Sequence, residues 1–245
     1  MLILIYCKLN FNGINLDDEL VGYTTVNVEG RGLMTRDINT LNIEGRDGDY
    51  ILGGKYPPRK IVVHYVIKAT SNRNKLYILR RLNEYLQSTE DVLFYFADED
   101  EVFRYGRVIE VEDPPYDQWQ GLGKFVIHCQ DPYQYGRSRE AKGKIITRGL
   151  EPVDIEKICF KVSSSTKKLI VRNNRTVRKI VLNGNFSSGN LVEITKDKIF
   201  VNGENKMEYL DPMESDFHEF KLYRGDEVTV NYGGDILINY RERWI

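Results

Sequence analysis

Residues 123–136 read GKFVIHCQDPYQYG, and they decide how the rest of the chain is divided. The apolar side chains fall at every second position, which is the period of a β-strand with one buried face: Phe125, Ile127 and Cys129. Proline cannot donate to a strand ladder and restricts the residue before it, so Asp131 and Pro132 end the strand. The stretch therefore predicts that one domain finishes here and that a second domain starts after Gly136.

The same stretch brings histidine, cysteine and aspartate close together, and these residue types also serve in nucleophilic and metal sites. Neighbouring strand residues point to opposite faces, so His128 and Cys129 cannot both face one site on a regular strand. The other histidines, His64 and His218, lack the spacing of a metal motif. Cys129 is therefore predicted to be a small core residue, and we expect no catalytic, cofactor-binding or metal site. No catalytic motif is found elsewhere in the sequence, so the chain is not expected to be an enzyme.

The composition indicates a folded chain of two domains. It has 245 residues, more than the roughly 100–150 typical of one domain, and 41% of them are hydrophobic. The net charge of −1 argues against nucleic acid as a partner, because nucleic-acid-binding domains usually carry a basic excess. Three widely spaced cysteines imply no disulfide framework. The apolar start, MLILIYCK, is much shorter than the ~20 residues of a membrane span, so we interpret it as a buried strand and expect no membrane partner.

The first domain, residues 1–136, is predicted to be α+β, mostly β with one helix. The helix is expected at 71–88, with Ser71 or Asn72 as its cap. Its apolar residues recur at the spacing of one helix face: Leu76, Leu79, Leu82, Tyr85 and Leu86. Other apolar runs are typical of strands, at 60–68, 92–96 and 102–111.

The second domain, residues 137–245, is predicted to be a β-sandwich made of short strands. Residues 136–152 are basic and polar, which suits either a linker or a strand that crosses between the domains. Asn183-Gly184 and Asn202-Gly203 are typical of tight hairpin turns. The alternating run at 228–240, interrupted by Gly233-Gly234-Asp235, predicts a further hairpin.

The order of these segments is similar to that of a known family. FNGI at 11–14 and GRDG at 45–48 precede the strand that Arg59 leads, and the helix comes next. VLFYFADED, RYGRV and CQDPYQYG then follow, and the second half of the chain finishes in INYRERWI. In this order the motifs resemble the siphophage distal tail protein family, often called Dit, over essentially the whole chain and most strongly in 43–136.

This resemblance implies a structural hub protein of the distal tail, at the baseplate or tail tip of a long-tailed phage or prophage. The first domain, a β-sandwich with the helix, would form a homo-hexameric ring, with residues of about 30–60 as a belt-like arm onto the neighbouring subunit. The tail tube protein would lie on one side of the ring, and a tail-associated hub, lysin or fibre protein on the other. The second domain would look like a galectin or carbohydrate-module sandwich. The protein would be synthesised in the host cytoplasm and reside at the tail tip of the virion.

Five residues of the arm are proposed to make subunit contacts: Arg31, Met34, Arg36, Arg46 and Asp47. The alternative for each is an ordinary exposed loop residue. A long arm that is rich in glycine and proline, with few core residues, is costly to order alone, and packing on a neighbour would offset that cost. Three residues are expected where the two domains meet: Pro132, Tyr133 and Tyr135.

A second function is compatible with the same sequence, namely a carbohydrate-binding module that attaches the tail tip to host cell-wall sugars. Such modules stack sugar rings on exposed aromatic side chains. The second domain offers five aromatic residues, although several alternate as core positions: Tyr209, Tyr223, Tyr232, Tyr240 and Trp244.

Overall fold

The computed structural model describes residues 7–115 and 119–245. The chain divides into two compact units, here called unit 1 (Met1–Gln134 with Ile245) and unit 2 (Tyr135–Trp244). The predicted domain limits, 1–136 and 137–245, place this division two residues later along the chain. The strand expected in MLILIYCK lies largely outside the described residues.

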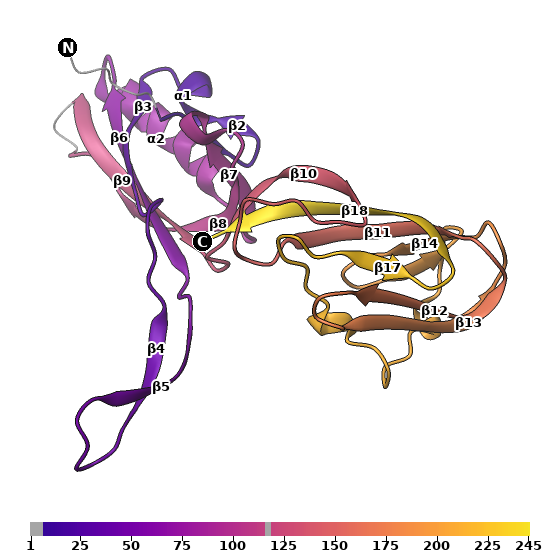
Figure 1. Ribbon diagram of the computed structural model, residues 1–245. Helices are drawn as coiled ribbons and strands as arrows, with labels where there is room; N and C mark the ends of the chain where they lie inside the picture. Colours follow the sequence, from indigo (N-terminus) through magenta and orange to yellow (C-terminus); the bar gives the residue numbers. More distant parts are fainter. Residues whose placement is uncertain (1–6, 116–118) are drawn as a thin grey trace. The chain divides into compact units, whose positions relative to one another are not determined.

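Unit 1 is built on a seven-stranded sheet in the order β2-β1-β7-β8-β9-β6-β3 (Figure 1). The strands are β1 (Leu9–Phe11), β2 (Ile14–Asn15), β3 (Tyr23–Glu29), β6 (Arg59–Lys68), β7 (Val92–Phe96), β8 (Arg104–Glu112) and β9 (Gln120–Cys129). Neighbouring strands are antiparallel. The longest pairing joins β6 and β9 from Arg59↔Cys129 to Lys68↔Gln120, so the stretch that ends at Cys129 lies inside the sheet.

The core of unit 1 lies between one face of this sheet and the helix α2 (Asn72–Leu86). Alternate residues of β6 are fully buried there, because a strand exposes successive side chains to opposite faces. The Ser71 hydroxyl accepts a hydrogen bond from the Asn74 backbone N–H and so caps the helix, as the sequence predicted. Besides α2, the described part of unit 1 contains a second, four-residue helix, α1 (Leu16–Glu19), and the 3-10 turn η1 (Ala97–Glu99).

The buried stripe of α2 differs in part from the predicted one. Ile78, Leu82 and Leu86 are buried at four-residue spacing, whereas Leu76 is 47% exposed. The prediction that Leu76 belongs to the core face is therefore wrong, and Ile78 takes that place. Lys75 is also buried, and its ammonium group donates to the carbonyls of Pro114, at 3.4 Å, and Pro115.

The segment between β3 and β6 forms a separate hairpin of β4 (Asp37–Asn42) and β5 (Asp49–Lys55). Within the described residues these strands pair only with each other, and every residue in them is exposed. Figure 1 shows them as a ribbon apart from the seven-stranded sheet. We call residues 33–55 the arm.

Unit 2 contains two sheets whose inner faces enclose one apolar core. The larger follows the order β10-β18-β11-β14-β15-β16 and the smaller follows β13-β12-β17. Their bounds are β10 (Gln134–Lys142), β11 (Asp154–Val162), β12 (Thr166–Asn173), β13 (Lys179–Phe186), β14 (Leu191–Ile194), β15 (Ile199–Val201), β16 (Glu204–Asn205), β17 (Val228–Val230) and β18 (Gly233–Trp244). Two 3-10 turns, η2 (Met207–Tyr209) and η3 (Phe217–Glu219), complete the unit. The predicted fold class, mostly β with an α+β first part and a C-terminal sandwich, is confirmed.

Some turns predicted for unit 2 are correct and others are wrong. Asn202 and Gly203 have φ of 50° and 84° and connect β15 to β16, as expected for a tight turn. Gly184 instead lies inside β13, where a side chain would come within 2.5 Å of the Tyr209 ring. This glycine is therefore explained by close packing and not by a turn.

The prediction of a hairpin at 228–240 is also wrong. β17 pairs with β12, whereas β18 pairs with β11, so the two strands belong to different sheets. Apolar residues alternate in both strands whether the strands pair with each other or belong to two sheets, because each strand places one face on the shared core. Residues 136–142 of the basic segment belong to β10, an edge strand of the larger sheet, and residues 143–152 lie in the connection to β11.

Candidate assembly surface

The arm exposes a set of large apolar side chains that no core covers. They are Leu33, Ile38, Leu41, Ile43, Tyr50, Ile51 and Leu52. Ile51 and Leu52 are 69% and 66% exposed. Scattered exposed apolar residues are ordinary, but a continuous group on one short hairpin indicates an interaction surface.

Both faces of the arm are apolar. Leu41 lies opposite Tyr50 on one face, and Thr40 lies opposite Ile51 on the other. An irregularity between Asn39 and Thr40 shifts the register along the ribbon. An isolated two-stranded hairpin is only marginally stable in water, so packing of both faces against another surface would stabilise the arm.

Four of the five predicted contact residues lie on or beside the arm. The Arg36 guanidinium lies 4.6 Å from the Tyr56 ring centre, and that of Arg46 lies 4.1 Å from the Tyr50 ring centre. Asp47 is exposed in the connection between β4 and β5. Met34 is half-buried. Sequence reasoning missed the apolar side chains of the arm, although the run Tyr50-Ile51-Leu52 between glycines was a usable signal.

Arg31, the fifth predicted residue, is held by its own subunit. Its guanidinium forms a two-point ion pair with Asp98, at 2.8 and 2.9 Å, and approaches Glu99 at 3.7 Å. It also lies 4.8 Å from the centre of the Phe96 ring. The hydrogen bonds from Arg31 hold the pKa of Asp98 below its ordinary value. Arg31 therefore fixes the base of the arm to unit 1.

The predicted junction residues fall on either side of the division between the units. The Pro132 carbonyl accepts from Arg59, and the Tyr133 N–H donates to the Asp131 carboxylate at 3.0 Å. The Tyr133 ring contacts the Tyr56 ring edge-on, with 6.3 Å between the ring centres. Tyr56 directly follows the arm in the sequence. Tyr135 is buried and opens unit 2.

Two buried arginines near this point were not predicted. Arg59 and Arg104 are 2% and 0% exposed, and each is the first residue of its strand, β6 or β8. Arg104 donates to Glu99 at 3.1 Å and to Gln134 at 2.8 Å. A fully buried arginine needs such partners, because an isolated buried charge is very costly.

The histidine–cysteine cluster does not form a site. Cys129 is buried in the core of unit 1, as predicted, and burial raises the pKa of its thiol to about 12. The neighbouring Arg104 and Arg59 oppose this shift, but the thiolate is still strongly disfavoured. His128 lies on the outer face of β9, opposite Lys60. In the part of the chain that the structure describes, no group of three or more His, Cys, Asp or Glu side chains could hold a metal ion.

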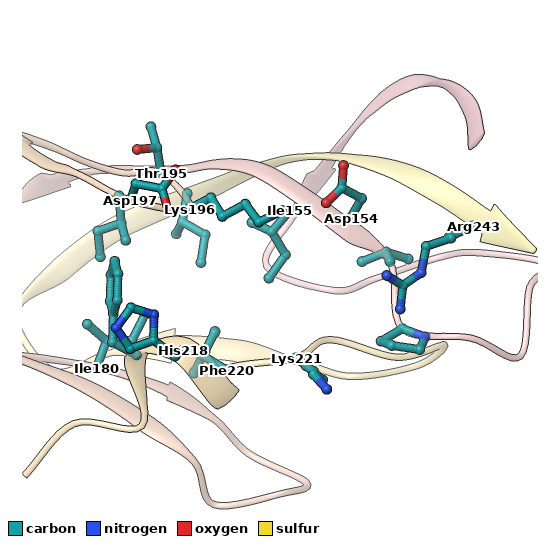
Figure 2. A pocket seen from close by; sticks show the side chains of 15 residues that line it. Asp154, Ile155, Ile180, Thr195, Lys196, Asp197, His218, Phe220, Lys221 and Arg243 are labelled. Atoms are coloured by element: carbon teal, nitrogen blue, oxygen red, sulfur yellow. The ribbon is translucent and has the colours of Figure 1, made fainter. Parts of the chain in front are cut away.

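Unit 2 contains a cavity of about 250 Å³ between its two sheets. Part of its wall is apolar and includes Ile158, Ile180, Ile194 and Phe220. Figure 2 shows Lys196 and Asp197 across from His218, with Asp154 and Arg243 nearer the other end. Burial raises the pKa of Asp154, although the positive charges of Lys196 and Arg243 oppose the shift. The cavity thus combines an apolar wall with charged groups of both signs.

The aromatic residues considered for sugar stacking do not line this cavity within the described residues. Tyr240 is buried, and its hydroxyl donates to the Ile146 carbonyl at 2.6 Å. Tyr209 packs on Phe186, and Tyr223 lies beneath Arg175. Trp244 is half-buried, whereas Tyr232 is exposed. These five residues therefore form no common platform.

No helix within 7–115 or 119–245 is long and apolar enough to cross a membrane.

Comparisons with known proteins agree with this architecture. The family model described as "Phage tail protein RIFT-related domain" matches residues 18–128, and "Siphovirus-type tail component, C-terminal domain" matches residues 154–244. Together the two models span most of both units. The two matches thus define the chain as a component of a siphovirus-type phage tail.

Two solved structures share the fold. The crystal structure of SPP1 Dit (gp 19.1), described as a paradigm of hub adsorption apparatus in phages that infect Gram-positive hosts, superimposes with a TM-score of 0.83 at 19% identity, over 97% of this chain and 99% of that chain. A chain of the phage p2 baseplate in its activated conformation with strontium gives a TM-score of 0.51 at 9% identity, over 96% of this chain and 97% of that chain. No curated protein matches in a sequence search. The chain belongs to the siphophage distal tail protein family, Dit, and is a phage tail component.

Proposed function

We propose that this protein forms a hexameric ring at the distal end of the tail and joins the tail tube to the tail-associated hub, lysin or fibre protein. Unit 1 is the ring-forming domain, and the arm docks on the neighbouring subunit. The protein is made in the host cytoplasm and resides at the tail tip of the virion. Its role in this proposal is structural and includes no catalytic step.

The observation that carries the proposal is the arm, with apolar side chains exposed on both faces of a hairpin that pairs with no other described strand. A projecting element that binds a different surface on an identical neighbour makes a heterologous contact, which closes into a ring when the rotation permits. Met34, Arg36, Arg46 and Asp47 lie among these apolar residues. The two arginines and the aspartate would supply polar contacts at the same interface, and Met34 a further apolar one. Arg31 would fix the base of the arm.

The test compares the wild type with an Ile51→Asp, Leu52→Asp double variant. Both side chains are exposed, so the variant should unfold at the same temperature as the wild type. A charged aspartate cannot be buried cheaply in an apolar interface, so the variant should remain monomeric where the wild type assembles. Light scattering and electron microscopy at micromolar concentration, with and without tail tube protein, measure assembly. An Ile146→Asp, Leu150→Asp variant is the matched control, because both residues are exposed in unit 2. A wild type that stays monomeric with its partners would overturn the proposal.

A second proposed function, sugar binding by unit 2, is supported by the cavity. Its volume of about 250 Å³ is slightly below the roughly 300–1,000 Å³ of typical ligand pockets, so the cavity would take no more than a single sugar ring. The isoleucine and phenylalanine wall could contact the apolar face of a ring, while Asp154 and Arg243 could exchange hydrogen bonds with hydroxyl groups. This arrangement differs from stacking on the five aromatic residues.

The full-length protein should be titrated with host cell-wall polysaccharide while the NMR signals of the cavity are followed. We expect shifts at Asp154 and Ile194, and these shifts should be weakened in an Asp154→Asn variant. Asp235→Asn, a change of an exposed carboxylate elsewhere in unit 2, is the control. No shift at millimolar sugar would remove this function.

A further inference from the structure

The Arg59 guanidinium joins two segments that lie far apart in the sequence. It donates from Nη1 to the carbonyls of Gly30 at 2.9 Å and Gly32 at 3.0 Å. From Nε it donates to the carbonyl of Pro132 at 3.2 Å. Gly30 and Gly32 begin the departure of the chain toward the arm, and Pro132 belongs to the last residues of unit 1. Residues 30–32 are called the arm root, and residues 130–134 the exit segment.

Arg59 is also the residue at which the chain returns from the arm and enters β6. Its bonds to the arm root therefore close the base of the arm from both sides. The close approach depends on Gly30, which has φ of +86° and where a side chain would lie 2.0 Å from the Lys60 carbonyl oxygen. Only glycine adopts this conformation and fits this space readily.

A second chain of contacts runs parallel to the first. Arg31 binds Asp98 and approaches Glu99, and Glu99 accepts from Arg104. Arg104 in turn donates to the Gln134 side chain at 2.8 Å. The arm root and the exit segment are thus linked twice, once directly through Arg59 and once through this relay.

The direct link depends on the shape of arginine. The planar guanidinium presents donors in diverging directions and can reach carbonyls of two segments at once, whereas the three donors of a lysine ammonium group all sit on one nitrogen atom. All three acceptors of Arg59 are neutral carbonyls, and burial together with the charge of Arg104 lowers its pKa. A buried cation without a carboxylate of its own is costly to maintain. Packing of the core alone would not require a buried arginine at this position.

We propose that Arg59 is the positioning residue of the arm and couples the arm root to the exit segment, so that docking of the arm on a neighbouring subunit also orders residues 130–134. The inference rests on the proposed ring. Coupling between two sites is reciprocal, so a disordered exit segment weakens docking of the arm by the same factor. Whether the arm is docked or free thereby determines how well ordered residues 130–134 are, at the end of unit 1.

Hydrogen–deuterium exchange of the full-length protein, across the concentrations at which the ring assembles, tests the coupling. In the wild type, peptides that contain the arm and peptides that contain Tyr133 and Gln134 should both become protected as the ring forms. Arg59→Lys should keep the circular dichroism spectrum, raise exchange at residues 30–36 at least tenfold and raise the concentration needed for assembly at least tenfold. Arg81→Lys, which alters an exposed arginine on α2, should change neither quantity.

The Ile51→Asp, Leu52→Asp variant supplies a second test that does not alter Arg59. At concentrations where the wild type is assembled, the exit segment of this variant should exchange as fast as the exit segment of the dilute wild-type monomer. If the wild type forms a ring but its exit segment exchanges as fast as in the monomer, the coupling is overturned and the proposed ring still holds. Assembly of Arg59→Lys at the wild-type concentration would overturn the positioning role. A wild type that never assembles would overturn the proposed ring and the coupling together.

Discussion

Arg31 and Asp98 form a two-point ion pair at the base of the arm, with Nη1–Oδ1 at 2.8 Å and Nη2–Oδ2 at 2.9 Å. Both side chains are less than one quarter exposed, at 23% and 24%, so solvent screens the pair only in part. The pair connects the chain that leads to the arm with the turn η1 that follows β7. This contact makes the stability of the arm root depend on pH.

Asp98→Asn should lower the free energy of unfolding by about 1–2 kcal/mol at pH 7, because the two-point ion pair is replaced by a weaker contact between the Arg31 cation and a neutral amide. The hydrogen bonds from Arg31 lower the folded-state pKa of Asp98 from 3.8. Its stabilisation is therefore present above pH 3.8 and is lost as the pH falls through the folded-state pKa. Denaturant unfolding of both proteins between pH 7 and pH 2.5 should show the difference shrinking at acid pH. A difference independent of pH would contradict this account, and Asp235→Asn is the control.

Leu82→Ala should destabilise unit 1 by about 2–5 kcal/mol, since it removes a side chain buried in the core beneath α2. Leu76→Ala on the same helix should change stability by less than about 0.5 kcal/mol, because that side chain is largely exposed. Thermal unfolding followed by circular dichroism measures both. Equal effects would mean that the face of α2 is assigned wrongly.

Gly123→Ala should destabilise unit 1 by about 1–3 kcal/mol through overpacking. An added side chain would lie 2.4 Å from the Tyr65 ring and 2.9 Å from the Glu112 carbonyl oxygen. Gly32→Ala is the matched control, because open space surrounds that position. Chemical denaturation should separate the two variants clearly, and a neutral Gly123→Ala would show that Tyr65 moves aside freely.

Asp226→Ala should destabilise unit 2 by about 2–3 kcal/mol, because it leaves buried donors without an acceptor. The Asp226 carboxylate accepts from the Asn173 amide at 2.7 Å and from the Tyr223 N–H at 3.0 Å, and it also pairs with Arg175. Burial opposes ionisation, yet these hydrogen bonds hold the pKa of Asp226 below its ordinary value. Asp235→Ala should be neutral when both variants are compared by urea unfolding. A neutral Asp226→Ala would argue against this network.

Cys129 should resist thiol reagents in the native protein. With a pKa of about 12, it should react about 10³-fold more slowly near neutral pH than an exposed cysteine. Cys159 is half-buried on β11 and should react first. Mass spectrometry of labelled peptides reports the order, and labelling in denaturant is the control. Cys129→Ser should leave ring assembly largely intact, whereas loss of assembly without unfolding would contradict a purely structural cysteine.

Local sequence patterns were sufficient for the strands β6 to β9 and for α2. The alternation from Arg59 to Lys68 and the spacing along α2 are properties of neighbouring residues, so they predict a strand and a helix before any partner is known. The same holds for Cys129, whose place beside Phe125 and Ile127 follows from a period of two. The order of short motifs was enough to indicate the family.

Partners from distant parts of the chain decided the remainder. Alternation alone cannot say which sheet a strand joins, so β17 and β18 were interpreted as one hairpin although they pair with β12 and β11. The spacing of apolar residues in α2 did not decide whether Leu76 or Ile78 belongs to the buried face. The structure shows that Ile78 is buried and Leu76 is exposed.

By itself, the sequence determined the strands β6 to β9, the helix α2 and the buried cysteine, because each follows from residues that are close neighbours along the chain, and the order of its short motifs indicated the family. Only the tertiary structure decided which apolar residues the arm leaves exposed and what the two buried arginines bind. Arg59 and Pro132 are 73 positions apart, and a hydrogen bond over that separation exists only once the sheet has brought the two segments together.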